Sequence, residues 1–154
     1  MLLFLDIDGV MVPAKGWKNP EFLKDGFAAF SNKATTILKG LITENLTVVL
    51  TTSHKSNFSI DEWKNIFKNR GITIEKMKSL SENINHLSRK DEIINWFNIN
   101  NAGEDFIIID DDKSLNDLPD FLKKNLIQTS SHIGLTEEHL EAINSILHKD
   151  FQTL

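Results

Sequence analysis

The chain has 154 residues, of which 40% are apolar and 25% charged, and this balance suits one globular domain with its own core. A formal charge of −5 provides no overall attraction to nucleic acid or to anionic membranes, so such a partner would need a local basic patch. The absence of cysteine excludes disulfides and thiolate metal sites. The apolar amino terminus is interrupted by Asp6 and is too short for a signal-peptide core or a membrane span. We therefore expect a single domain over residues 1–154 in a soluble, cytoplasmic protein.

Apolar runs predict β-strands, and helical patterns occupy the intervals between them. The predicted strands are residues 2–5, 46–50, 72–74, 106–109 and 126–127. Helices are predicted over residues 33–43, from a capping box at 59–62 to 70–71, from a cap at 88 through 97, over 114–123, and over 137–148 after a cap at 136. Strands alternating with helices predict an α/β fold: a Rossmann-like three-layer sandwich around a mostly parallel five-stranded sheet. Residues 9–30 show no clean period and are expected to form a flap or loop.

The first predicted strand ends in Asp6-Ile7-Asp8-Gly9, which places two carboxylates one residue apart before a glycine. The carboxyl end of a buried strand is where α/β proteins place their chemistry. Neighbouring carboxylates repel each other and are costly to desolvate, so the pattern favours a bound cation, a proton or a reaction. A plain turn is the alternative, because Asp-Gly is a strong turn dipeptide.

Hydroxyl groups follow the second predicted strand at Thr51, Thr52 and Ser53, and His54 and Lys55 come directly after them. Hydroxyl and backbone N–H groups at this position could bind an oxyanion such as phosphate, and the two basic residues could contact a nucleic-acid backbone. For the hydroxyl residues a role in a turn or cap is the alternative. For His54 it is a loop hydrogen bond.

A cation stands in the first turn of the third predicted helix, where Lys90 follows the expected cap Ser88. Positive charge there opposes the helix dipole, which favours a purpose beyond helix stability, although a solvated surface lysine is the alternative.

Three successive carboxylates, residues 110–112, follow the fourth predicted strand. With Asp6 and Asp8 they supply hard oxygen ligands suited to Mg²⁺, which takes a few carboxylates and shares the rest of its coordination with water and phosphate. Lys90 and Thr51 add a positive charge and a donor. The set is complementary to a phosphoryl group undergoing in-line transfer.

The order of these four motifs along the chain resembles the haloacid dehalogenase (HAD) superfamily, without a large cap. A narrower resemblance, to the HAD domain of Swiss Army Knife RNA repair proteins, covers nearly the whole chain. It is carried by Leu50-Thr51-Thr52-Ser53-His54-Lys55, Ser88-Arg89-Lys90-Asp91-Glu92-Ile93, Ile109-Asp110-Asp111-Asp112-Lys113-Ser114-Leu115 and Gly134-Leu135-Thr136.

This resemblance implies that the strand before Asp6 lies between the strands ending at Thr51 and Asp110. Asp6 would be the nucleophile, forming an aspartyl-phosphate that is then hydrolysed. Asp8 would act as general acid toward the leaving group and then as general base toward water. Thr51 would donate to the phosphoryl oxygens, and Lys90 would offset the charge of Asp6 and phosphate.

The resemblance also implies a Mg²⁺ site made by Asp6, the backbone carbonyl of Asp8, and a carboxylate of the later motif. Many relatives carry glycine where Asp110 stands, so either Asp110 or Asp111 could be the direct ligand. Only 42 residues separate Asp8 from Thr51, which leaves no room for a large cap domain. An open site suits a large substrate or a phosphorylated chain end.

The favoured function is therefore a Mg²⁺-dependent phosphohydrolase acting on phosphorylated RNA or DNA ends, and Lys15, Trp17 and Lys18 could add contacts to a nucleic acid. For Trp17, an anchor that packs the flap onto the domain is the favoured alternative. A phosphatase of nucleotides or small phosphoesters is the nearest alternative. A receiver-like signalling domain is disfavoured by Asp8, because a second carboxylate at that position promotes hydrolysis. An inactive binding module with the same fold is the remaining alternative, and the oligomeric state is left open.

Overall fold

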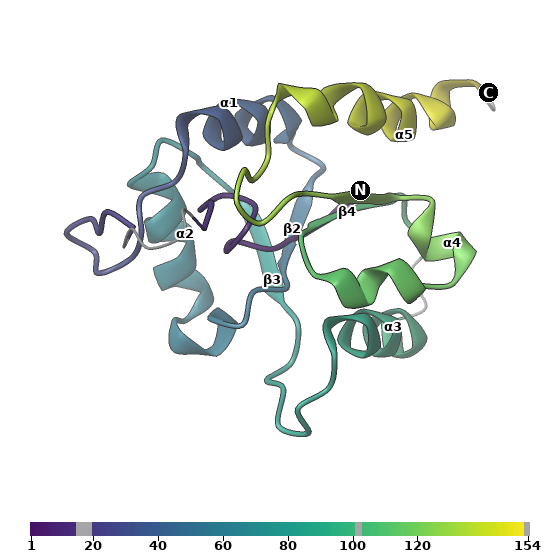
Figure 1. Cartoon of the computed structure of the whole chain (residues 1–154), viewed down its shortest axis with the longest axis horizontal. Coiled ribbons are helices and arrows are strands. Elements are labelled where there is room, and N and C mark those ends of the chain that lie inside the picture. The colour runs from purple at the N-terminus through teal and green to yellow at the C-terminus, as the bar shows by residue number, and fades with distance from the viewer. Residues whose placement is uncertain (15–19, 101–102, 153–154) are drawn as a thin grey trace.

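The computed structural model describes residues 1–14, 20–100 and 103–152, and side chains up to residue 147. Its centre is a five-stranded, entirely parallel sheet in the order β3-β2-β1-β4-β5 (Figure 1). The strands are β1 (Leu2–Leu5), β2 (Thr47–Leu50), β3 (Lys76–Ser79), β4 (Phe106–Asp110) and β5 (Leu126–Gln128). The predicted fold class is confirmed, and β1 lies at the centre of the sheet, between β2 and β4.

Helices cover both faces of the sheet, as Figure 1 shows. The α-helices are α1 (Asn32–Leu41), α2 (Ile60–Lys68), α3 (Arg89–Asn100), α4 (Asp120–Lys123) and α5 (Leu140–Gln152). Short 3₁₀ turns are η1 (Lys55–Asn57), η2 (Lys113–Asp117) and η3 (Glu137–His139). The single helices expected over 114–123 and 137–148 are each preceded or divided by one of these turns. Among the described residues, none of the helices is long and apolar enough to cross a membrane.

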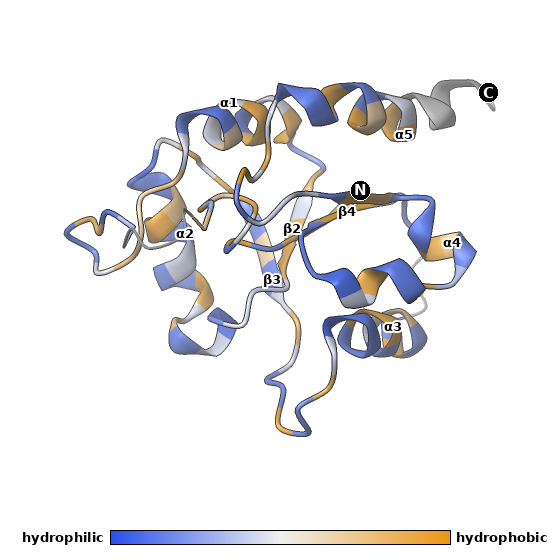
Figure 2. Ribbon diagram, in the orientation of Figure 1, coloured by the Kyte–Doolittle hydropathy of each residue, from blue (hydrophilic) through white to orange (hydrophobic). Residues whose placement is uncertain are grey.

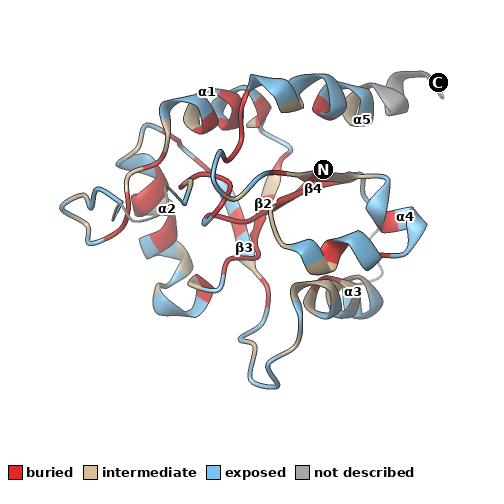
Figure 3. Ribbon diagram, in the orientation of Figure 1, coloured by how far each residue is buried: buried red, intermediate tan, exposed pale blue. Residues whose placement is uncertain are grey.

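Successive side chains of a strand point to opposite faces of the sheet, and this divides the core into two layers. In β1, Leu3 and Leu5 pack with α1, α2 and α5, whereas Leu2 and Phe4 pack with α3 and α4. Because both faces are covered, every residue of β1 is buried, and the strand is apolar along its whole length. Figures 2 and 3 show the apolar, buried residues of the central strands, and helices whose outer faces are largely hydrophilic and exposed.

The helix starts follow local capping chemistry. Ser59 and Glu62 form the predicted capping box at the start of α2. Ser88 accepts a hydrogen bond from the backbone N–H of Asp91, as expected for a cap of α3. Ser31 provides the same type of cap for α1.

The position of β3 corrects one prediction. Residues 72–74 were predicted as a strand, but Ile72 and Ile74 are buried in the connection that precedes β3. The strand itself is Lys-Met-Lys-Ser, with only Met77 fully buried. β3 is an edge strand beside β2, and both of its lysines are exposed. The apolar run before it marks core packing, not strand pairing.

Arg70 makes most of the hydrogen bonds between the α2 region and the described part of residues 9–30. Arg70, just beyond α2, is paired with Asp25 through both carboxylate oxygens and donates to the carbonyls of Phe27, Ala28 and Ile66. This Arg70 clamp holds the segment around Phe27 against the core in the absence of regular secondary structure.

Candidate active site

The carboxyl edge of the sheet brings the predicted motifs together. In the register, Leu5 of β1 pairs with Leu50 of β2 and with Ile109 of β4. The next residue of each strand is Asp6, Thr51 and Asp110 respectively, so three functional side chains emerge side by side. The ladder continues into the site, because the backbone N–H of Asp6 donates to Ile109 and that of Thr51 donates to Leu5. The folded sheet thus brings together side chains that the sequence motifs placed at the ends of three separate strands.

Three carboxylates form the centre of the site. Oxygens of Asp6, Asp110 and Asp111 all lie within 4.8 Å of one another. Burial, and next the neighbouring charge of Asp110, raise the pKa of Asp6 from 3.8 to about 9, although Arg89 acts in the opposite direction. Burial likewise raises the pKa of Asp111. Such a surplus of negative charge makes the site a suitable binding place for a divalent cation with oxygen ligands.

Asp110 and Asp111 differ in what their oxygens already contact. Asp110 is fully buried, and its Oδ2 accepts hydrogen bonds from Thr51 and Arg89 while its Oδ1 accepts one from the backbone of Asp112. Asp111 is half-buried and lies directly over Gly9, where a Cβ would come 2.0 Å from its Oδ2. Gly9 also has φ +80°, so two independent constraints require glycine there. Asp111 therefore has the freer oxygens for a metal ion.

Arg89 provides the positive charge beside these carboxylates. Its Nη1 donates to Asp110 Oδ2 at 2.6 Å and to Thr51 Oγ1 at 3.3 Å, and it lies 3.5 Å from Asp6 Oδ1. The side chain is buried to about nine-tenths, which disfavours its charged form, but Asp110 and Asp6 raise its pKa above the usual value. Arg89 therefore remains a cation inside the site.

This arrangement corrects the expectation that Lys90 offsets the charge of Asp6. The backbone N–H of Lys90 donates to Ser114 Oγ, and in the part of the chain that the structure describes no ion pair joins its ammonium to a site carboxylate. Arg89 is the first residue of α3, and its guanidinium contacts Asp6 and Asp110 at the carboxyl edge. Adjacent cations in Arg89-Lys90 were a signal for either position.

Two hydroxyl groups of the predicted oxyanion site are already engaged. Thr51 Oγ1 donates to Asp110 Oδ2 at 3.0 Å, so donation to a phosphoryl oxygen requires that this hydroxyl rotate. Thr52 is fully buried and accepts a hydrogen bond from the backbone of His54. Ser53 is exposed at the same loop.

The placement of Lys55 corrects the expectation that it contacts a substrate. Its side chain is only 4% exposed, and Nζ donates to Glu92 Oε2 at 2.9 Å. Glu92 Oε1 in turn lies 3.8 Å from Arg89 Nε, a buried nitrogen that has no hydrogen-bond partner among the described residues. Lys55 thus balances Glu92 beneath the site, a buried position that its place in a polar loop sequence did not indicate.

Asp8 and His54 face each other at the open rim of the site. Their side chains are more than one-third exposed, and His54 Nε2 lies 2.7 Å from Asp8 Oδ2. The other predicted contacts, Lys15, Trp17 and Lys18, lie outside the described residues.

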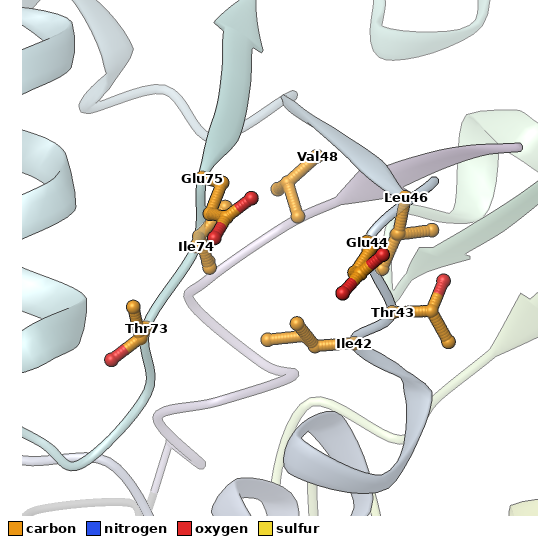
Figure 4. A pocket seen from close by; sticks show the side chains of 8 residues that line it. All are labelled: Ile42, Thr43, Glu44, Leu46, Val48, Thr73, Ile74 and Glu75. Carbon is orange, nitrogen blue, oxygen red and sulfur yellow. The ribbon is translucent and has the colours of Figure 1, made fainter.

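Two of the cavities among the described residues lie outside the carboxylate cluster, at the two edges of the sheet. The cavity in Figure 4, of about 290 Å³, is lined by residues that precede β2 and β3, including Leu46 and Glu75, and so lies at the opposite, amino edge of the sheet. A larger one, of about 580 Å³, lies between the end of β3 and α3 and includes Trp96 and Glu92. Only the second borders the site, through Glu92.

Sequence comparison now decides the family. A family model described as the HAD domain in Swiss Army Knife RNA repair proteins matches residues 2–140. The chain belongs to this family. Comparison with curated proteins and comparison with solved structures each gave no match. The matched region includes the whole sheet and every site residue described above, and membership supports a HAD-type phosphohydrolase with an acidic cluster that could bind a metal.

Proposed function

We propose that this HAD domain is a Mg²⁺-dependent phosphomonoesterase that works through an aspartyl-phosphate on Asp6 and acts on phosphorylated nucleic-acid ends, RNA above all. The observation that carries the proposal is the meeting of Asp6, Asp110, Asp111 and Arg89 at the carboxyl edge of the sheet. A cluster so rich in buried negative charge is suited to hold a cation against a phosphate.

Asp6, Asp111 and the backbone carbonyl of Asp8 would hold the metal ion, with Asp110 fixing the cluster from below. When bound, Mg²⁺ supplies positive charge to the phosphoryl oxygens and favours the ionised form of the carboxylates. This suits Asp6, whose raised pKa otherwise keeps it protonated near neutral pH. Ionised Asp6 is the form that can act as a nucleophile.

The reaction then divides into two displacements at phosphorus. In the first, an oxygen of Asp6 forms a bond to phosphorus as the ester oxygen leaves and takes a proton from Asp8. In the second, a water molecule gives a proton to Asp8 and attacks phosphorus, which returns Asp6 as a carboxylate and releases inorganic phosphate. Arg89, placed beside Asp6, offsets the negative charge that develops on the phosphoryl group.

The shape of the rim supports a large substrate. Asp8 and His54 are accessible, and the part of the β1–α1 segment around Asp25 and Phe27 packs onto α2 through the Arg70 clamp. A phosphate at the end of a chain can therefore reach Asp6. The family's description, in RNA repair proteins, favours RNA among such chains. The net charge of −5 implies that binding depends on local contacts.

The test is release of inorganic phosphate from a 3′-phosphorylated RNA oligonucleotide, a 5′-phosphorylated oligonucleotide and an aryl phosphate, each with Mg²⁺ or with EDTA. Wild type is expected to turn over with Mg²⁺ only, and Asp6→Asn to lose at least ~10³-fold in turnover because the nucleophile is removed. The exposed Asp61→Asn serves as a matched control and should retain full activity.

Two other results of the phosphate-release assay would contradict part of the proposal. Turnover that survives in Asp6→Asn, or in EDTA, contradicts the proposed chemistry. Efficient hydrolysis of the aryl phosphate or of nucleotides with no activity on oligonucleotides keeps the chemistry but replaces nucleic-acid ends by a small phosphoester as substrate.

A further inference from the structure

The contact between His54 and Asp8 joins two loops at the rim of the site. Asp8 follows β1 and His54 follows β2, and the distance from Nε2 to Oδ2 is 2.7 Å. We propose that His54 is a positioning residue that orients the carboxyl group of Asp8 as proton donor and acceptor. The inference rests on the proposed function, and it assigns His54 a role other than contact with the substrate.

His54 is itself held from several sides. Its ring packs edge-on against Phe27, with centroids 5.7 Å apart. Asn57 Nδ2 lies 3.5 Å from Nδ1, an arrangement that favours the tautomer with the proton on Nε2. The backbone N–H of His54 donates to Thr52 Oγ1, and its carbonyl accepts from the N–H of Asn57. The ring therefore has little freedom to leave Asp8.

The supports of His54 are anchored in the core. Lys55, the next residue, is fixed by its buried ion pair with Glu92, and its carbonyl accepts a hydrogen bond of 3.0 Å from Trp63 Nε1. Phe27 is held by the Arg70 clamp, whose guanidinium donates to its carbonyl and lies 5.8 Å from its ring centroid. These contacts transmit the rigidity of α2 and α3 to an exposed side chain.

The geometry determines which oxygen of Asp8 can exchange a proton. With Nε2–H donating to Oδ2, the transferable proton of the neutral acid belongs on Oδ1. As the phosphorus–oxygen bond breaks, this proton moves from Oδ1 to the leaving oxygen, and Asp8 becomes a carboxylate. The hydrogen bond from His54 then has a charged acceptor and becomes stronger, so it holds the orientation of the Asp8 carboxylate between the two displacements. In the second displacement Oδ1 takes a proton from water, and His54 keeps its own proton throughout.

A leaving-group comparison tests this role. A phenolate with an electron-withdrawing group leaves with little need for protonation, whereas an alkoxide such as a nucleoside hydroxyl depends on the acid. The assay measures kcat and KM for p-nitrophenyl phosphate and for a 3′-phosphorylated RNA oligonucleotide. His54→Phe keeps an aromatic ring against Phe27 but removes the donor, and His54→Gln retains a side-chain N–H. The exposed His86→Gln is the matched control.

We expect His54→Phe to lower kcat for the oligonucleotide by roughly 10-fold or more, a part of the general-acid contribution, with KM unchanged. The aryl phosphate should change by less than about 3-fold, and His54→Gln should recover much of the loss if its N–H reaches Oδ2. His86→Gln should match wild type on both substrates. Thermal unfolding of each variant shows whether the fold is kept.

The opposite patterns overturn the inference. An equal loss of kcat on both substrates indicates general damage to the loop, and a rise in KM alone indicates that His54 contacts the substrate. No change in any parameter shows that the contact is incidental. If wild type fails to hydrolyse either substrate, the proposed function itself is contradicted and the role of His54 is contradicted with it. If Asp6→Asn loses activity while His54→Phe keeps it, the proposed function stands and only the role of His54 is contradicted.

Discussion

Among the described residues, two buried arginines pair with aspartates, and the surroundings of the two arginines differ sharply. In the Arg70 clamp, one arginine meets one carboxylate and several backbone carbonyls, and its three nitrogens all donate hydrogen bonds. In the site, Arg89 faces Asp110 and Asp6 together, and its Nε has no partner among the described residues. Every guanidinium nitrogen of Arg70 thus has a hydrogen-bond partner, whereas Arg89 faces two carboxylates and keeps one nitrogen without a partner among the described residues.

The pKa values follow this contrast. Hydrogen bonds from Arg70 hold the pKa of Asp25 well below its usual value of 3.8. Burial and the charge of Asp110 raise that of Asp6 to about 9. A satisfied pair stabilises the ionised carboxylate, whereas the site keeps carboxylates that need a further cation. The clamp is built for stability, and the site keeps an electrostatic excess that a metal and a phosphoryl group can use.

Replacing Arg89 should give the largest effect. Arg89→Met is expected to lower turnover by at least ~10²-fold, because it removes the charge that faces the phosphoryl group, whereas Lys90→Met should change turnover by less than about 3-fold. Steady-state kinetics on the best substrate of the proposed function provides the measurement. A larger loss in Lys90→Met than in Arg89→Met would restore Lys90 to the role that the sequence suggested.

Replacing Arg70 should affect stability. Arg70→Met removes the guanidinium donors to Asp25 and to the carbonyls of Phe27 and Ala28, and we expect a loss of about 3 kcal/mol in the free energy of unfolding. Urea denaturation measures it, and replacement of the exposed last residue of α2, Lys68→Met, should stay within about 0.5 kcal/mol of wild type. An equally small loss in Arg70→Met would show that the clamp contributes little.

In EDTA, Asp6 and Asp25 should make the free energy of unfolding depend on pH in opposite directions. The raised pKa of Asp6 means that the folded state binds the extra proton, so this contribution is complete below about pH 3.8 and is lost as pH rises toward 9. The lowered pKa of Asp25 gives a contribution present above about pH 3.8 and lost as pH falls below it.

Urea midpoints measured across this range for Asp6→Asn and Asp25→Asn separate the two contributions. Asp6→Asn should remove a decline of up to about 1.4 kcal/mol per pH unit above pH 4, and Asp25→Asn should remove only the acid-side loss. If wild type and Asp6→Asn show the same change in stability from pH 5 to 9, the raised pKa of Asp6 is contradicted.

Local pattern determined much of this protein. The apolar runs around β1, β2, β4 and β5 predicted strands because each is buried on both faces or bounded by turn residues, and the serine caps marked the starts of α2 and α3. Alternation of strands and helices then implied a parallel sheet. In such a sheet, the residues that follow the strands meet at one edge. The family resemblance implied that the strand before Asp6 lies between the strands ending at Thr51 and Asp110, and the register confirms this order.

Only the tertiary structure decided the partners of the charged side chains. The choice of Arg89 over Lys90 depends on how α3 enters the site, and the burial of Lys55 depends on Glu92 from another element. The start of β3 was missed because an edge strand pairs on one side and needs no apolar run. The spacing of apolar residues predicts which side chains are buried. Ion pairs between distant segments depend on distances that exist only once the chain has folded.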